Sequence, residues 1–256
     1  MSGMKRDILI FGHAGYAGKY PENTLIACEK AFADGADGIE FDVRLTKDNK
    51  VVLIHDDEIS RVSDGKGKVK DLTLEELRRF NFAVHNKNVD FAIIPTLEDV
   101  LKILPSHAFL NVEFKEVEVV KPALVLLRHA NPDHIILSSF ILEALEVARR
   151  VAPHYKRGVL FGEKYKDLFE TDKGDTILSE LKKYEPYSFH LPIQSLDMYP
   201  KERILPFLDN VRKRGIKVIF WTCDIDEKVD EIIEHIDGII TNEVEGMVKH
   251  LRLHAE

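Results

Sequence analysis

Short apolar segments alternate with amphipathic segments along almost the whole chain of 256 residues, and this alternation constrains the fold most. Apolar runs typical of strands lie at 7–11, 38–45, 51–55, 109–115, 135–140, 158–161, 187–191, 217–222 and 238–241. Helical periodicity lies at 23–33, 96–104, 121–129, 142–151, 176–184, 202–214, 228–235 and 244–253. We expect Asn23 to cap the first helix. Alternating strands and helices predict a parallel sheet covered by helices.

One pair of strands breaks this alternation. Only residues 46–50 join strand 38–45 to strand 51–55, whereas a parallel crossover needs about a dozen residues. The second strand should therefore return antiparallel, through a turn at Asp48 and Asn49. The other eight strands, each followed by a helix, predict a single TIM (β/α)8 barrel domain over residues 1–256. A doubly wound open sheet is the alternative, but no glycine-rich phosphate motif follows the first strand.

Residues 57–94 do not fit the repeat. They contain Gly65, Gly67, many charges and one short helical segment that begins with a capping box of Thr73 and Glu76. Long loops in compact domains are often functional, so we expect an insertion that caps the C-terminal mouth of the barrel. An excursion over the surface, without a role in the site, is the alternative.

Composition excludes several classes of protein. The formal charge is −8, from 36 basic and 44 acidic residues, which disfavours a nucleic-acid partner. Cys28 and Cys223 are too few for a disulfide framework and predict reduced thiols and a cytoplasmic location. No run approaches the roughly 18 apolar residues of a spanning helix, so we expect no stable insertion into a membrane. The oligomeric state stays open.

Acidic side chains follow the parity of two barrel strands. Glu40 and Asp42 are two residues apart and share one face of their strand, and Glu113 lies on the next barrel strand. Three carboxylates at one mouth repel one another unless a cation lies between them, and oxygen ligands suit Mg²⁺ or Ca²⁺. The alternative is a set of buried salt bridges to Lys115 and Arg44, although two bases do not balance three acids.

Two histidines lie at strand ends near these carboxylates. His13 follows the first strand and His55 ends the returning strand. Imidazole exchanges protons near neutral pH, so the pair is suited to acid–base catalysis. His190 ends the sixth barrel strand and is the one further histidine that we consider as a site residue.

Six motifs in order now resemble one family. They are GHAGYAGKYPENT, GIEFDVRLTKDNKVVLIHD, IPTL, NVEFK, WT and DGIITN. Together they resemble the glycerophosphodiester phosphodiesterase family, in order and spacing across most of the chain, and residues 55–77 are similar to the insertion of that family.

The resemblance implies a barrel like that of phosphatidylinositol phospholipase C. It implies hydrolysis of small-molecule glycerophosphodiesters to glycerol 3-phosphate and an alcohol, with one divalent cation, Mg²⁺ or Ca²⁺. The positions matching the family's site are the metal ligands Glu40, Asp42 and Glu113, the acid–base pair His13 and His55, Lys115 near the phosphate, and Trp221 at the pocket wall.

One position departs from the family pattern. The opening motif His-Arg-Gly is here His13-Ala14-Gly15, so a cation that contacts the phosphate in the family is missing. Lys19, in the same loop, is the candidate replacement, although an ammonium lacks the planar fork of Arg. The departure leaves open an impaired or non-catalytic binder of glycerophosphodiesters. A lysophospholipase D or phospholipase-type enzyme on the same scaffold is a separate alternative.

Overall fold

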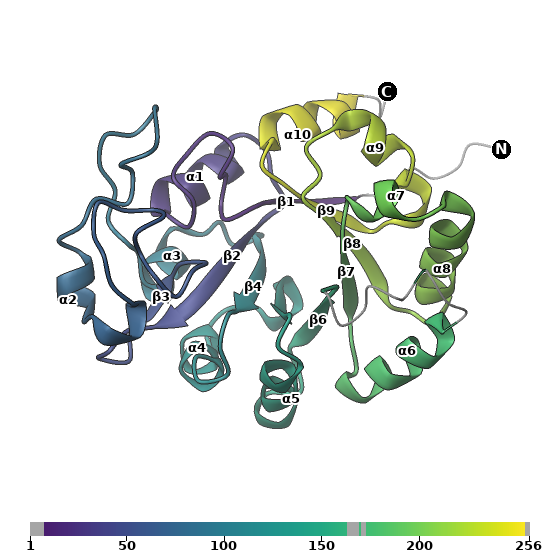
Figure 1. The fold of residues 1–256 in the computed structure, drawn as a ribbon, viewed down its shortest axis with the longest axis horizontal. Helices are drawn as coiled ribbons and strands as arrows, with labels where there is room; N and C mark the ends of the chain where they lie inside the picture. The colour runs from purple at the N-terminus through teal and green to yellow at the C-terminus, as the bar shows by residue number, and fades with distance from the viewer. Residues whose placement is uncertain (1–7, 163–168, 170–172, 254–256) are drawn as a thin grey trace.

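Eight parallel strands close into a barrel (Figure 1) in a computed structural model that describes residues 8–162, 169 and 173–253. The strands are β1 (Leu9–Gly12), β2 (Gly38–Leu45), β3 (Val51–Leu53), β4 (Phe109–Phe114), β5 (Ile135–Ser139), β6 (Lys156–Leu160), β7 (Ser188–Pro192), β8 (Lys217–Trp221) and β9 (Gly238–Thr241). The strand order is β1-β9-β8-β7-β6-β5-β4-β2-β3, and pairing of β1 with β2 closes the ring. This confirms the predicted TIM barrel.

The short strand β3 is the only antiparallel member among the described strands. It pairs with β2 in the register Val43 to Leu53 and Leu45 to Val51. Asn49 turns the hairpin with a left-handed φ of 59°, a conformation that asparagine tolerates better than most residues. The five-residue connection therefore forms the predicted hairpin.

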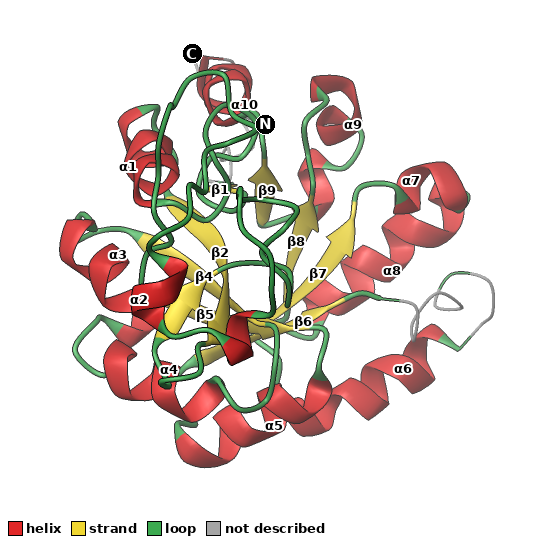
Figure 2. Ribbon diagram, turned by 60° about the vertical axis from the view of Figure 1, so that its left-hand side comes forward, coloured by secondary structure: helices red, strands yellow, loops and turns green. Residues whose placement is uncertain are grey.

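Helices surround the strands on the outside (Figure 2). They are α1 (Leu25–Ala33), α2 (Leu74–Leu77), α3 (Leu97–Ile103), α4 (Val120–Leu127), α5 (Leu142–Val151), α6 (Gly174–Leu181), α7 (Ser195–Met198), α8 (Lys201–Lys213), α9 (Asp226–Asp230) and α10 (Val244–Leu253). Single 3₁₀ turns lie at Val69–Asp71, Pro132–His134, Lys182–Tyr184 and Ile233–His235. No helix among the described residues is both long enough and apolar enough to cross a bilayer.

Strand parity divides the apolar side chains between two layers. Alternate residues of β2, namely Ile39, Phe41 and Val43, are fully buried in the cluster between strands and helices. A smaller apolar cluster that includes Phe11 and Ile240 forms separately from it. Glu40 and Asp42 alternate with these residues and therefore point to the opposite face of β2, toward the inside of the barrel, as the alternation predicts.

Two local predictions were wrong. Thr24, not Asn23, caps α1. The hydroxyl of Thr24 accepts the backbone N–H of Ala27, whereas the side chain of Asn23 bonds to Asp42 of β2. The expected helix 228–235 is broken into α9 and a 3₁₀ turn. The four-residue helix α7 was not predicted.

The insertion at 57–94 packs against the strand β3 in a small apolar cluster. Val52 and Ile54 come from β3 and the residues after it, and the buried members from the insertion are Ile59, Val69, Leu77, Phe82 and Ile94. The capping box of Thr73 and Glu76 begins α2 as predicted. The insertion also contacts the loop after β1, where the side-chain amide of Asn88 donates to the carbonyl of Lys19 at 2.7 Å. Its role as a cap over the mouth stays a prediction.

Candidate active site

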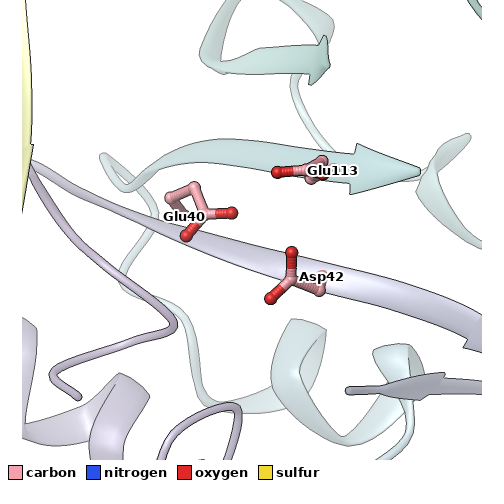
Figure 3. A group of neighbouring side chains, drawn as sticks. All are labelled: Glu40, Asp42 and Glu113. Carbon is pink, nitrogen blue, oxygen red and sulfur yellow. The ribbon is translucent and has the colours of Figure 1, made fainter. Parts of the chain in front are cut away.

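Three carboxylates converge on the neighbouring strands β2 and β4. The strand register sets Glu40 opposite Asn111 and Asp42 opposite Glu113. Figure 3 shows the three side chains around one shared space between the two strands. One oxygen from each of Glu40, Asp42 and Glu113 lies within 4.8 Å of the others, and all three residues are buried. The predicted convergence of acidic side chains is therefore present.

Among the described residues, Lys115 is the one lysine or arginine that pairs with these acids, and it contacts two of the three. The ammonium of Lys115 contacts Oδ1 of Asp42 at 3.0 Å and also contacts Glu113. Arg44, the other base considered, binds Glu116 and the carbonyl of His55 instead. The arrangement of buried salt bridges thus leaves the acidic group short of positive charge.

Burial with too little positive charge nearby raises the pKa of two of the three carboxyl groups. Burial, together with the charge of Asp42, raises the pKa of Glu40 to about 8 and the pKa of Glu113 to about 8. Burial opposes ionisation of Asp42 too, but Lys115, His55 and the amide of Asn23 outweigh it and lower the pKa of Asp42. The cluster as a whole is therefore unfavourable in its fully ionised form without a further cation.

The donor set fits a divalent metal ion. Hard carboxylate oxygens are the ligands that Mg²⁺ and Ca²⁺ prefer, and three converging oxygens with an unbalanced charge are suited to such an ion. Glu40, Asp42 and Glu113 are the residues that would hold it. The donors alone do not select between the two metals.

The Nδ1 atom of each of the two histidines is hydrogen-bonded to a side-chain oxygen. Nδ1 of His13 lies 2.8 Å from Oδ1 of Asn242, and its Nε2 lies 4.0 Å from Glu40. Nδ1 of His55 lies 2.7 Å from Oδ1 of Asp56. Both rings line the same cavity as the carboxylates. Their Nε2 atoms are the nitrogens left for exchange of protons with a ligand.

A chain of charged groups behind His55 was not predicted. Arg61 of the insertion donates to Asp56 through Nε and to Glu22, in the loop after β1, through both terminal nitrogens at 2.8 and 2.7 Å. Burial would raise the pKa of Asp56, but the bond from Arg61 outweighs it and lowers that pKa. The sequence signal was the acid directly after His55.

Asn23 also supports the site rather than a helix. Its side-chain amide donates to Oδ2 of Asp42 at 2.9 Å, and its Oδ1 accepts the backbone N–H of Asp42 at 3.1 Å. The residue adopts a left-handed φ of 56°. The sequence predicted Asn23 as a helix cap, so this contact across 19 residues was missed.

The cavity among these groups has a volume of about 150 Å³. Lys115 is its only permanent cation among the described residues, and aromatic rings form part of its wall. Trp221 lies there in edge-to-face contact with Phe140, with ring centroids 5.9 Å apart. The lining consists of His13, Glu40, Asp42, His55, Asn111, Glu113, Lys115, Phe140, Leu160, Trp221 and Ile240.

The structure does not bring Lys19 and His190 to this cavity. The ammonium of Lys19 bonds to Glu245 at 3.1 Å. His190 is fully buried, bonds to Ser188 at 2.8 Å, and burial lowers its pKa to about 3, so it stays neutral. Ala14 is buried at the site, and its backbone N–H donates to Glu40 at 3.0 Å. Thus no side chain described here replaces the arginine that the family has at position 14.

A parallel barrel with buried acids and two histidines at the C-terminal mouth has the layout of a barrel enzyme. The family model described as "Glycerophosphoryl diester phosphodiesterase family" matches residues 13–246. The chain therefore belongs to this family, which confirms the resemblance and the enzyme class expected from the motifs.

Full-length relatives agree with this assignment. A glycerophosphodiester phosphodiesterase from Caldanaerobacter subterraneus subsp. tengcongensis is 31% identical over 255 residues, which is 95% of this chain and 98% of the relative. The crystal structure of a glycerophosphodiester phosphodiesterase from Thermotoga maritima has a TM-score of 0.81 and 33% identity, and the match covers 95% and 98% of the two chains. A phosphodiesterase from Oleispira antarctica, in complex with the product sn-glycerol-3-phosphate, shares the fold with a TM-score of 0.82 at 22% identity, over 95% and 96% of the chains.

Proposed function

We propose that this chain hydrolyses glycerophosphodiesters to sn-glycerol 3-phosphate and an alcohol, with one Mg²⁺ or Ca²⁺ ion. One observation carries the proposal: three buried carboxylates, two of them paired with Lys115, converge beside His13 and His55. The relatives named above support the reaction class. The small cavity suits the phosphoglycerol part of a substrate, since pockets for drug-sized ligands usually reach ~300–1,000 Å³.

The carboxylates would hold a divalent ion, and Lys115 would bind the anionic phosphodiester beside it. A divalent ion held by Glu40, Asp42 and Glu113 would supply a Lewis acid for the phosphoryl oxygens. Lys115 lies between Asp42 and Glu113 and can stabilise the negative charge that develops on the phosphoryl group.

The histidines divide the transfer of protons between them. His13 removes the proton from the attacking hydroxyl, either of water or of the 2-OH of the glycerol, through its Nε2 atom. If the 2-OH attacks, a cyclic phosphate forms, and water opens this ring in a second step to give glycerol 3-phosphate. His55 donates a proton to the oxygen of the departing alcohol as the bond from phosphorus to that oxygen breaks. Its partner Asp56 is a carboxylate, which compensates the charge of an imidazolium, whereas His13 has a neutral amide as its partner. This difference supports His55 as the acid.

Because Ala14 stands where the family has an arginine, non-catalytic binding of glycerophosphodiesters is an alternative function. An arginine fork at the phosphate contributes about 3–4 kcal/mol when it acts in the transition state, which is ~10²–10³-fold in rate. The experiment measures release of glycerol 3-phosphate from glycerophosphocholine by the wild type and by Ala14→Arg, with Mg²⁺ or Ca²⁺ and with chelator. We expect metal-dependent turnover in both, faster in the variant. No release by the wild type with either metal would contradict the proposed activity.

A lysophospholipase D activity is the second candidate, and exposed apolar side chains favour it. Phe140 lines the cavity and is 42% exposed, and Met198 and Ile225, in segments that follow β7 and β8, are 66% and 51% exposed. An acyl chain could lie on such side chains. Comparison of glycerophosphocholine with lysophosphatidylcholine separates the candidates, since a higher kcat/KM for the lysolipid would replace our proposal.

We propose the cytoplasm as the compartment of this enzyme. Cys28 and Cys223 are both buried and unpaired. Burial raises the pKa of Cys28 to about 12, so this thiol stays protonated and unreactive. Fractionation of cells that produce the protein tests the location.

A further inference from the structure

We propose that the carboxylate of Asp224 fixes the orientation of the Asn242 amide, and that this amide holds neutral His13 in the tautomer protonated at Nδ1. Asp224 and Asn242 are then positioning residues for His13. The kinetic part of this inference rests on the proposed function, in which His13 is the base. The tautomer itself is a property of the free protein.

The three residues lie at the ends of neighbouring strands. The sheet order places β1 beside β9 and β9 beside β8. His13 directly follows β1, Asn242 directly follows β9, and Asp224 lies in the loop after β8. The backbone N–H of His13 also donates to the carbonyl of Thr241 at 2.8 Å. The backbone of His13 and its ring are therefore both attached to the end of β9.

Asp224 receives three hydrogen bonds from the turn after β9. Its Oδ1 accepts from the backbone N–H of Asn242 at 2.7 Å and from the hydroxyl of Thr241 at 3.0 Å. Its Oδ2 accepts from the side-chain nitrogen of Asn242 at 2.9 Å. The carboxylate thus meets both the main chain and the side chain of Asn242.

This arrangement determines which end of the amide faces His13. A carboxylate only accepts hydrogen bonds, so the NH₂ group of Asn242 must face Asp224 and its oxygen must face the imidazole. That oxygen lies 2.8 Å from Nδ1 of His13, so Nδ1 must carry a proton. A neutral imidazole has one proton, which leaves Nε2 as the acceptor. Nε2 is the nitrogen nearer Glu40, at 4.0 Å, and therefore the one suited to remove a proton in the site.

Nuclear magnetic resonance reads the tautomer directly. Long-range ¹H–¹⁵N spectra of metal-free protein labelled at histidine distinguish a protonated Nδ1 from a protonated Nε2, and His13→Gln assigns the signals. We expect neutral His13 to be protonated at Nδ1 in the wild type. A proton on Nε2 would overturn the proposal without any variant.

The isosteric change Asp224→Asn should invert the tautomer. The new amide keeps an oxygen for the backbone N–H of Asn242 but presents its NH₂ group to the Asn242 amide. That amide must rotate to accept, so its own NH₂ group faces His13 and drives the proton to Nε2. We expect kcat to fall by ~10²-fold or more, the contribution of a general base, with KM little changed. A His13 that stays protonated at Nδ1 would contradict the proposal.

A second change should restore the original tautomer. In the double variant Asp224→Asn/Asn242→Asp, a carboxylate at position 242 accepts from the new amide and from Nδ1 of His13. We expect the Nδ1 proton and most of kcat to return, which a merely structural role of Asp224 would not produce. This variant also decides the question if the single variant fails to fold, because failure to recover the Nδ1 proton would overturn the proposal.

The control is Asp209→Asn. Asp209 forms a similar bond with His235 at 2.8 Å, and neither residue lines the active-site cavity. We expect no change in the His13 tautomer or in kcat, and an equal loss in the control would contradict a specific role of Asp224. If Asp224→Asn inverts the tautomer while kcat stays unchanged, the positioning inference holds and the proposed role of His13 as base fails.

Discussion

At the scale of single residues, the site depends on how the charges around Lys115 balance. Its ammonium is mostly buried between Asp42 and Glu113, and these acids outweigh the cost of burial and raise its pKa. Lys115 therefore stays charged at neutral pH. Because burial and the charge of Asp42 raise the pKa of Glu40 to about 8, a bound metal ion would stabilise the cluster in addition to polarising a substrate.

Removal of either imidazole tests the division of roles between the histidines. We expect His13→Ala and His55→Ala each to lower kcat by ~10²–10⁴-fold, the usual contribution of general acid–base catalysis, with a normal melting temperature. His107→Ala, at an exposed position before β4, is the matched control and should behave as the wild type. Near-normal turnover of glycerophosphocholine by either site variant would refute its assignment.

Arg61 is the residue through which the insertion reaches His55. We expect Arg61→Ala to lower kcat/KM about tenfold, because Asp56 then loses the guanidinium that holds it beside the imidazole. Arg79→Ala removes an exposed ion pair with Glu75 on the same insertion and serves as the control. Steady-state kinetics of the two variants provide the comparison, and equal values would show that the Arg61 contact is dispensable.

At the scale of the elements, hydrogen bonds hold the loop after β1 against β2. Asn23 makes this connection through two hydrogen bonds to Asp42, one to its carboxylate and one to its backbone. The loop is thereby held against the carboxylates, and Asp42 is held in place by a residue from a different element.

Substitution of Asn23 should weaken the binding of the metal. Asn23→Gly keeps the left-handed backbone but removes the amide that orients Asp42, so we expect the affinity for Mg²⁺ to fall ~10–100-fold. Asn49, at the tip of the hairpin, also has a positive φ, so Asn49→Gly is the matched control and should leave the affinity for Mg²⁺ unchanged. Titration calorimetry on chelator-treated protein gives both constants. Equal affinities in the two variants would exclude a role for Asn23 in the metal site.

Local patterns predicted the elements better than their ends. Parity along β2 and β4 was sufficient to place Glu40, Asp42 and Glu113 on one face, since alternation is a property of every strand. The side chain of Asn23, by contrast, was assigned to the adjacent helix because its true partner lies 19 residues away. The same limit applies to Asn242, whose contact with His13 exists only because the barrel closes, and to Asp224, which bonds to Asn242.

At the scale of the whole molecule, closure of the barrel brings the first and last strands together. β1 pairs with β9 on one side and with β2 on the other, so His13 lies between Asn242 and Glu40. The eightfold alternation predicted this closure, whereas the function of the insertion at 57–94 could not be derived from its composition. Asp7, the first residue of the predicted strand 7–11, lies outside the described part of the chain.

The stability of the metal-free protein should fall as the pH rises. The pKa values of Glu40 and Glu113 are raised to about 8, above the usual pKa of a glutamate, so between about pH 4.5 and 8 the folded state binds protons that the unfolded state has released. Each such carboxyl lowers the free energy of unfolding by about 1.4 kcal/mol per pH unit, or ~3 °C in Tm.

Thermal melts in chelator between pH 5 and 8 measure this effect. The double variant Glu40→Gln/Glu113→Gln lacks both titrating carboxyl groups, so its Tm should depend less on pH. Saturating Mg²⁺ should raise the Tm of the wild type more at pH 8 than at pH 5. Identical slopes for the wild type and the double variant would contradict the raised pKa values of Glu40 and Glu113.

Anomalous diffraction from a crystal soaked in Mn²⁺ tests the central claim most directly, because Mn²⁺ takes the same oxygen ligands as Mg²⁺. The three buried carboxylates predict one anomalous peak, bound by oxygens of Glu40, Asp42 and Glu113, in the cavity that His13 and His55 line. A soaked crystal with Mn²⁺ bound elsewhere and no peak among these oxygens would contradict the account.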